Sequence, residues 1–490
     1  MNDWLNVILV LSALLGLMLG LRVWQRTRSP NSELVRKLVH IPMGLLTLSF
    51  PWLFTSPWPV TVLGGLAIGF LVSLRLVAPL AKRLGKVLGS VERRSLGEVY
   101  FTISIVTVFW MSSLSDVPAT EQQLLFIIPM LILTLADAVA ALIGVRYGQT
   151  RYTTDEGFKS AEGSLAFFMV AFFSVHIPLL LFSTTGRAET LMIAIILGLL
   201  VMLLEAIAWR GLDNLFIPMG SFLLLNAHLT MTISELVWRL VATVLLVLLG
   251  LAWRRNTTLN DSAILGVAFV GYIAWMLGGF TWLLPPLLLF LAYPWFVPWI
   301  EAPEDAPTQS TLTAQRWFDT ELGPQPGKIH TVVAVLSVSA AGLLWLVLAS
   351  LEDSGSSLLG DRPPLLYPYT LAYAVNLALI GVAGISSRHH WNPKHWLAVA
   401  RFSLQAWLIV SLPMLVLVFG FSTMAGLSTL LTFPLVWLAA ITFFLLQFSM
   451  RRYCNDVGSF ICRAIFSILF SILGYIPIML LHRYLSVAAS

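Results

Sequence analysis

The sequence predicts an all-α fold, a polytopic integral membrane bundle of about 14–16 transmembrane helices. Of the 490 residues, 58% are hydrophobic and only 11% are charged, whereas a soluble domain carries about 25% charged residues. Apolar runs long enough to cross a bilayer recur from one end of the chain to the other. These features exclude a water-soluble enzyme and make the bilayer the solvent for most side chains.

The predicted spans follow one another with short polar connections. In the first half they lie near residues 4–21, 36–54, 58–80, 98–114, 122–145, 162–183, 188–208, 212–230 and 234–253. In the second half they lie near residues 262–278, 280–299, 329–350, 366–386, 396–420, 426–448 and 458–484. Gly211 and Pro218 are expected to break the helix near 212–230, and irregular backbone at membrane depth is typical of a cavity lining.

A segment rich in proline and acidic residues at 301–328 marks the clearest boundary in the chain. We therefore expect a membrane domain over residues 1–256, a loosely attached membrane hairpin over 257–300 and a polar cytoplasmic linker over 301–328. A C-terminal transmembrane domain is expected over 329–490, and its residues suggest no role.

Lysine and arginine gather in alternate loops, those that follow the first, third, fifth, seventh and ninth predicted spans. Cytoplasmic loops of membrane proteins carry such an excess. We expect these loops in the cytoplasm, the N-terminus outside, and the chain in a cell inner or plasma membrane. The net charge of +5 then reflects topology, and no nucleic acid is expected as a partner.

The stretch from Asp137 to Gly163 carries the strongest sign of chemistry. An aspartate inside an apolar run costs a few kcal/mol in hydrocarbon, so it usually faces a partner or a site. On a helix Asp137 shares one face with Ala140, Gly144 and Gly148, so a carboxylate is followed by a groove of small residues. The spacing places Asp137 about two turns below the cytoplasmic surface.

The following span begins with two charged residues, Lys159 and Glu162. Ser160 is expected to cap this helix, because its hydroxyl can accept a hydrogen bond from a first-turn amide. A helix start also favours anions. These groups suit a metal-bound phosphate, and the alternative is a polar helix pair that only holds two spans together.

Basic residues and a histidine at the start of the second span fall on the same predicted membrane face. Arg36 and His40 lie one helical turn apart, and Lys37 lies beside them. They suit a phosphate clamp, and positive-inside anchoring of Arg36 and Lys37 is the alternative.

Acidic residues and an amide near two other span ends fall there too. Glu205, Asp213 and Asn214 could complete a metal site, because Mg²⁺ takes a few carboxylates together with phosphate oxygens. An N-cap pair is the alternative for Asp213 and Asn214. Glu98 begins a span, where pairing with the helix dipole is a strong alternative.

Four segments resemble motifs of the CTP-dependent lipid-alcohol kinases, the family of dolichol, phytol and polyprenol kinases. They are RKLVHIPMG at 36–44, RRSLGEVYF at 93–101, the Asp137–Gly148 face with KSAEGS at 159–164, and Glu205 with DNLFIP at 213–218. The segments lie in order within residues 31–255. Phe158 stands where the dolichol-kinase pattern has the first of two lysines.

The resemblance implies a membrane kinase that transfers the terminal phosphate of CTP to the hydroxyl of an isoprenoid lipid alcohol of the phytol or polyprenol type. It implies reaction at the cytoplasmic face with Mg²⁺ or another divalent cation. The implied catalytic residues are Asp137, Lys159 and Glu162, and the implied metal ligands are Asp137, Glu162, Glu205 and Asp213. The implied nucleotide and phosphate contacts are Arg36, Lys37, His40, Gly144, Gly148, Ser160, Gly163 and Asn214, with Glu98 as a further candidate.

Two other functions stay open on the sequence. CDP-lipid synthesis of the phosphatidate cytidylyltransferase type would release pyrophosphate from the nucleotide. A membrane transporter would use Asp137 and the broken helix near 212–218 as a substrate path. Polar groups that crowd one membrane face and avoid the midplane argue against transport.

Overall fold

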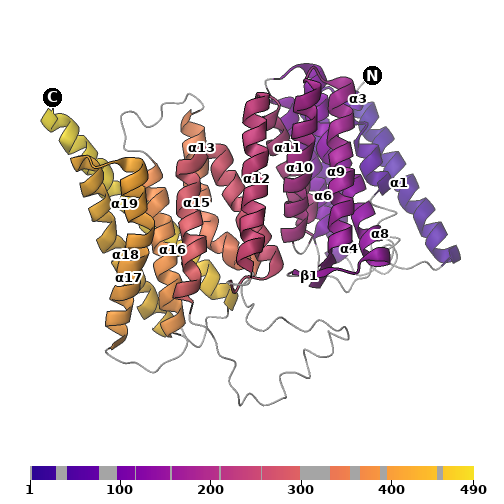
Figure 1. Ribbon diagram of the computed structural model, residues 1–490. Helices are drawn as coiled ribbons and strands as arrows, with labels where there is room; N and C mark the ends of the chain where they lie inside the picture. Colours follow the sequence, from indigo (N-terminus) through magenta and orange to yellow (C-terminus); the bar gives the residue numbers. More distant parts are fainter. Residues whose placement is uncertain are drawn as a thin grey trace, which may run out of the picture. The chain divides into compact units, whose positions relative to one another are not determined.

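The computed structural model describes residues 3–28, 41–76, 96–115, 117–154, 157–208, 211–254, 257–297, 331–353, 365–386, 394–449 and 456–489. Over these ranges the chain is almost entirely helical (Figure 1), which confirms the predicted all-α class. Ten of the described helices are long and apolar enough to cross a membrane, and three shorter apolar helices accompany them.

The chain divides into two compact units, Met1–Leu245 and Leu246–Ser490. The domain limits that composition places at residues 256, 300 and 328 stay predictions. The linker at 301–328 lies outside the described residues.

The first unit is a helical bundle with one small sheet. It contains α1 (Asp3–Arg28), a helical stretch at 41–47, α3 (Phe50–Leu53), α4 (Pro57–Leu76), α6 (Gly97–Ser113), α7 (Ala119–Leu131), the π-helix η2 (Ile132–Ala136), α8 (Asp137–Tyr147), β1 (Arg151–Thr154), β2 (Gly157–Ser160), α9 (Ala161–Phe182), α10 (Arg187–Ile207) and α11 (Asp213–His228). The unit boundary falls within α12 (Ile233–Trp253).

Helix α10 lies at the centre of this unit, between α9 and α11. In the apolar, membrane-spanning part of α10, 67% of the residues are buried, compared with 28% in that of α9. Helix α9 also packs along α8, and α11 packs along α6 and α7. The apolar sequence of α10 therefore serves protein packing, whereas much of α9 is left to face lipid.

The second unit contains α13 (Asp261–Phe296), α15 (Val332–Asp353), α16 (Leu366–Ser386), α17 (Lys394–Met414), η4 (Leu415–Phe419), α18 (Thr423–Ser449) and α19 (Asp456–Ala489). Its central helix is α16. In the apolar, membrane-spanning part of this helix 89% of the residues are buried, and it packs against α13, α15, α17, α18 and α19. Helix α13 is interrupted at Gly279, whose φ of 71° glycine adopts readily. This break falls between the two predicted spans near 262–278 and 280–299.

Candidate active site

Asp137 begins α8 directly after the π-helical turn η2. π-Helical turns are rare and occur frequently at functional sites. The aspartate is half-buried. Because an α-helix rises about 1.5 Å per residue, Asp137 lies about 15 Å along the axis from Tyr147, the last residue of α8. It is therefore nearly three turns from the helix end, and its expected depth of two turns below the cytoplasmic surface stays a prediction.

The helical stretch at 41–47 packs closely against this turn. A Cβ added at Gly44 would overlap the side chain of Thr134, which lies in η2 one turn before Asp137. Gly44 is the last residue of the RKLVHIPMG segment, so the structure brings the end of that segment next to the turn that carries Asp137. The other predicted residues of the segment, Arg36, Lys37 and His40, lie outside the described residues.

Three glycines form the crossing of α8 and α9. A Cβ at Gly148 would lie 2.7 Å from the Ser160 Cβ, and one at Gly144 would lie 3.1 Å from the Ser160 Oγ. A Cβ at Gly163 would lie 3.1 Å from the carbonyl oxygen of Ala140. The predicted small-residue groove is therefore filled by the start of α9, an arrangement typical of close helix packing in membranes. Phosphate binding by these glycines stays a prediction.

The segment between α8 and α9 forms a β-hairpin, where the sequence suggested only a polar loop. β1 and β2 pair antiparallel, with Tyr152 opposite Lys159. The signal that was missed is a pair of short runs with aromatic and β-branched residues, RYTT and GFKS, separated by two acidic residues. The hairpin lies at the end of the unit where α9 begins (Figure 1).

Ser160 caps α9, as predicted. Its side chain accepts a hydrogen bond from the Gly163 amide at 3.1 Å. Glu162, in the first turn of α9, accepts a hydrogen bond from the Thr150 amide, with its two oxygens 3.0 and 3.3 Å from that nitrogen. The predicted catalytic and metal roles of Glu162 remain predictions, but its carboxylate already has a partner in the hairpin.

Lys159 reaches from β2 to the last turn of α10. Its Nζ lies 2.7 Å from Glu205 Oε1, and it also donates to the carbonyl oxygen of Glu205. The side chains are 27% and 15% exposed, so the pair is shielded but open on one side. The structure thus joins two predicted site residues that are far apart in the sequence.

Asp213 adds a second negative charge to this ion pair. Burial alone would lower the pKa of the Lys159 ammonium, but the Glu205 carboxylate and a smaller effect of Asp213 raise it above the ordinary lysine value. Gly211, with a φ of 82°, makes the sharp turn that ends the α10–α11 connection. The predicted break therefore falls before α11, whereas Pro218 lies inside the continuous helix.

The start of α11 differs from the N-cap alternative. The N-cap position is Leu212, Asp213 is the first helical residue, and no side chain caps the helix. Asn214 follows in the first turn, where its backbone N–H donates to the Gly211 carbonyl oxygen at 3.3 Å. The N-cap alternative is thus not seen, and the site roles of Asp213 and Asn214 stay predictions.

Glu98 lies at the same end of the bundle as Asp213. It is in the first turn of α6, which packs along α11. Ser115, just after α6, donates to Asn226 near the end of α11 at 2.9 Å. The two helices therefore run in the same direction, and their first turns share one end of the unit.

The cluster formed by Lys159, Glu205 and Asp213, called here the lysine cluster, combines one cation with two carboxylates. Within the described ranges no three His, Cys, Asp or Glu side chains group closely enough to hold a metal ion by themselves. Magnesium commonly takes one or two carboxylates and completes its shell with substrate phosphates and water. Glu205 and Asp213 could supply such carboxylates, and the predicted divalent cation stays a prediction.

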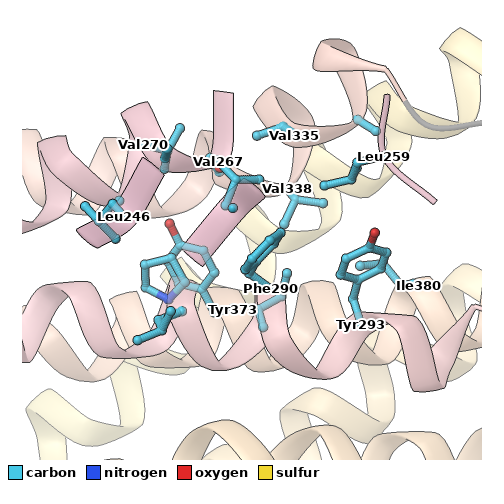
Figure 2. A pocket seen from close by; sticks show the side chains of 18 of the residues that line it. Leu246, Leu259, Val267, Val270, Phe290, Tyr293, Val335, Val338, Tyr373 and Ile380 are labelled. Atoms are coloured by element: carbon cyan, nitrogen blue, oxygen red, sulfur yellow. The ribbon is translucent and has the colours of Figure 1, made fainter. Parts of the chain in front are cut away.

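The second unit contains a separate small apolar cavity of about 90 Å³. Figure 2 shows Leu246, Val270, Phe290, Tyr293 and Tyr373 around it, and its lining is almost entirely hydrocarbon. No sequence-predicted site residue that the structure describes lines this cavity.

Comparison with known proteins identifies one relative. The chain is 30% identical to a phytol kinase from Synechocystis sp. over 226 residues, which are 45% of this chain and 90% of the relative. That length is about the length of residues 31–255, which carry the motif-like segments. No protein-family model matches the chain, and no solved structure matches it significantly. Because the match covers almost the whole of the relative, the chain belongs to the phytol kinase family.

Proposed function

We propose that the protein is a membrane kinase that transfers the terminal phosphate of CTP to the hydroxyl of an isoprenoid lipid alcohol of the phytol or polyprenol type. The single observation that carries the proposal is the lysine cluster, in a chain that is 30% identical to a phytol kinase over 226 residues. CTP as donor rests on the resemblance of the motifs to CTP-dependent kinases.

The proposed chemistry needs positioning and charge neutralisation more than covalent catalysis. The oxygen of the lipid hydroxyl attacks the terminal phosphorus, and the bond from that phosphorus to the bridging oxygen of CDP breaks. The hydroxyl proton passes to a carboxylate, for which Asp137 is the candidate. The products are a lipid monophosphate and CDP.

Each site residue has a proposed part in this transfer. Lys159 exchanges its contact with Glu205 for triphosphate oxygens. Glu205 and Asp213 hold a divalent cation together with those oxygens, and the cation supplies charge neutralisation at the phosphates. Asn214 lies in the first turn of α11, where the free backbone amides of the helix N-terminus favour anions. Glu98 is a further candidate at the same end of the bundle.

The alternating loop charges support a cytoplasmic site. The hairpin itself belongs to one of these basic loops, with Arg151 and Lys159 on its strands, so its end of unit 1 is proposed to face the compartment that holds nucleoside triphosphates. The lipid tail would stay in the bilayer while its hydroxyl reaches this surface.

A label-transfer experiment tests the proposal. Purified protein receives CTP or ATP, each labelled in the terminal phosphate, with Mg²⁺ and phytol, a polyprenol or diacylglycerol. The expected result is label in an isoprenoid monophosphate with CTP as the better donor. A parallel reaction contains phosphatidate in place of the alcohol. Release of labelled pyrophosphate with formation of an unlabelled CDP-lipid there, and no label in any isoprenoid monophosphate, would indicate cytidylyl transfer and overturn the proposal.

The Asp137→Asn variant tests the central residue. An amide at this position cannot accept the hydroxyl proton and binds a cation poorly. We expect turnover to fall by about 100-fold or more, the size typical of a lost general base. Turnover like that of the unaltered protein would remove Asp137 from the reaction.

A further inference from the structure

Both ends of the β-hairpin are tied to the first turn of α9. The Thr150 amide, just before β1, donates to the Glu162 carboxylate at 3.0 and 3.3 Å. The Thr150 carbonyl oxygen accepts from the Ala161 amide at 2.8 Å. Thr150 is therefore held on both of its backbone groups by the first two residues of α9, which closes the base of the hairpin.

Strand β1 is held to α9 at a second point along its length. Tyr152 and Ser164 share a hydrogen bond of 2.8 Å between their hydroxyl groups, and Tyr152 lies opposite Lys159 in the strand register. Lys159 is next to the Ser160 cap on the other strand. The backbone of Lys159 is thus fixed by contacts that run through β1, while only its side chain extends to Glu205.

Glu162 directs its carboxylate into this anchor. Both of its oxygens approach the same backbone amide, so a metal ion that took both oxygens would displace the bond that closes the hairpin. The carboxylate that contacts Lys159 is that of Glu205, and Asp213 adds a weaker electrostatic attraction. Glu162 acts on the lysine cluster through the backbone of the hairpin.

We infer that Glu162 is a positioning residue that closes the hairpin base and thereby sets Lys159 against Glu205 and Asp213, and that it is not a metal ligand. This inference rests on the proposed kinase function for its kinetic consequences, and it replaces the metal and catalytic roles that the sequence suggested for Glu162.

The kinetic test compares two variants in the full-length protein with CTP, Mg²⁺ and phytol. Glu162→Ala removes both acceptor oxygens, and misplacement of Lys159 should lower kcat by up to about 100-fold. Glu162→Gln keeps one acceptor oxygen for the Thr150 amide and should recover about tenfold or more of that loss. In both variants the Mg²⁺ concentration for half-maximal rate should change by less than about twofold, as for a residue outside the metal shell.

Coupling to Lys159 gives a second kinetic readout. If Glu162 acts through Lys159, Lys159→Met with Glu162→Ala should be no slower than Lys159→Met alone, because effects of residues that act as a unit are not additive. Glu189→Ala is the matched control, since Glu189 is a first-turn glutamate of the neighbouring helix α10. It should leave kcat near the unaltered value.

Hydrogen exchange tests the inference without any activity. Peptides that cover the hairpin should exchange at least about tenfold faster in Glu162→Ala than in the unaltered protein, and Glu162→Gln should restore most of the protection. Faster exchange supports the positioning role even if phytol is not phosphorylated. Failure of the positioning role can therefore be told apart from failure of the proposed kinase function.

Two results would overturn the inference. One is unchanged exchange at the hairpin in Glu162→Ala. The other is a rise of about tenfold or more in the Mg²⁺ requirement of Glu162→Gln, equal to that of Glu162→Ala, which would identify Glu162 as a metal ligand.

Discussion

At the scale of single residues, the Lys159 ammonium supplies the positive charge that offsets the carboxylates of the candidate site. Its ammonium lies against Glu205 and within the field of Asp213. An arriving triphosphate would compete with Glu205 for the lysine, and a divalent cation carried by that nucleotide would take over the carboxylates. In the proposed reaction the site would therefore exchange one set of ionic contacts for another with little net desolvation.

Lys159→Met should separate the two roles of this residue. Loss of the ammonium should raise the KM for the nucleotide by about tenfold or more, which corresponds to about 1.4 kcal/mol. It should also lower the free energy of unfolding by about 1–3 kcal/mol, because Glu205 loses a charged partner in a shielded place. Initial rates and thermal unfolding in detergent measure the two effects.

The double variant Lys159→Met with Glu205→Gln is the control for stability. It removes the orphaned charge and should recover much of the lost stability while the nucleotide KM stays high. An unchanged KM in Lys159→Met alone would remove the lysine from the phosphates.

The raised pKa of Lys159 fixes the direction of a pH effect. The contribution of the ion pair to stability is fully present below the ordinary lysine pKa of 10.5 and is lost as the pH rises through the higher folded-state value. The difference in unfolding temperature between the unaltered protein and Lys159→Met should therefore stay constant from about pH 6 to about pH 9. A difference that shrinks within that range would contradict the assigned protonation state.

At the scale of elements, the crossing of α8 and α9 supports the hairpin. A Cβ at Gly163 would meet the Ala140 carbonyl oxygen at 3.1 Å and the Gly144 Cα at 3.2 Å. Backbone atoms cannot rotate away as a side chain can, so the two helices would have to move apart. The hairpin and Lys159 would move with α9.

Gly163→Ala should therefore destabilise the protein by about 1–3 kcal/mol, the usual effect of overpacking. Gly65→Ala is the matched control, because a Cβ at Gly65 in α4 has no neighbour within 4 Å among the described residues, and alanine favours helix more than glycine does. Thermal unfolding of both variants checks the comparison. Equal midpoints would show that the crossing tolerates a methyl group.

The sequence could predict the elements that depend on local chemistry. The spans, the Ser160 cap and the break between the two halves of α13 follow from hydropathy, hydroxyl capping and glycine content. The hairpin was missed because its strands are short, polar and interrupted by charge, so they resemble a loop. The π-turn and the Lys159–Glu205 pair depend on packing between segments distant in the sequence, which no local pattern reveals.

At the scale of the whole molecule, the family match covers 45% of the chain, and the described contacts of the candidate site lie within the unit Met1–Leu245. The second unit has its own central helix and its own cavity. The contacts described for the candidate site at the hairpin involve no residue of the second unit.

A chain that ends at residue 256 should therefore keep kinase activity. Expressed in membranes, it should phosphorylate the lipid alcohol within about threefold of the full-length rate, the level expected when no site contact is lost. Loss of activity in a truncated chain that still unfolds cooperatively would assign the second unit a part in the reaction. Cooperative unfolding is the control that the shortened chain is folded.

The π-turn η2 also sets a rotational phase. Each residue of an α-helix advances the side-chain direction by about 100°, and a π-turn accommodates one additional residue per turn. Deleting one residue between Ile132 and Ala136 would therefore let α7 and α8 join as a regular helix, with Asp137 and the glycines that follow pointing in nearly the same direction relative to α7. Deleting one residue from the regular helix of α7 would instead turn the carboxylate and the α9-binding face by about 100°. The π-turn should thus tolerate the loss of a residue better than the regular helix beside it.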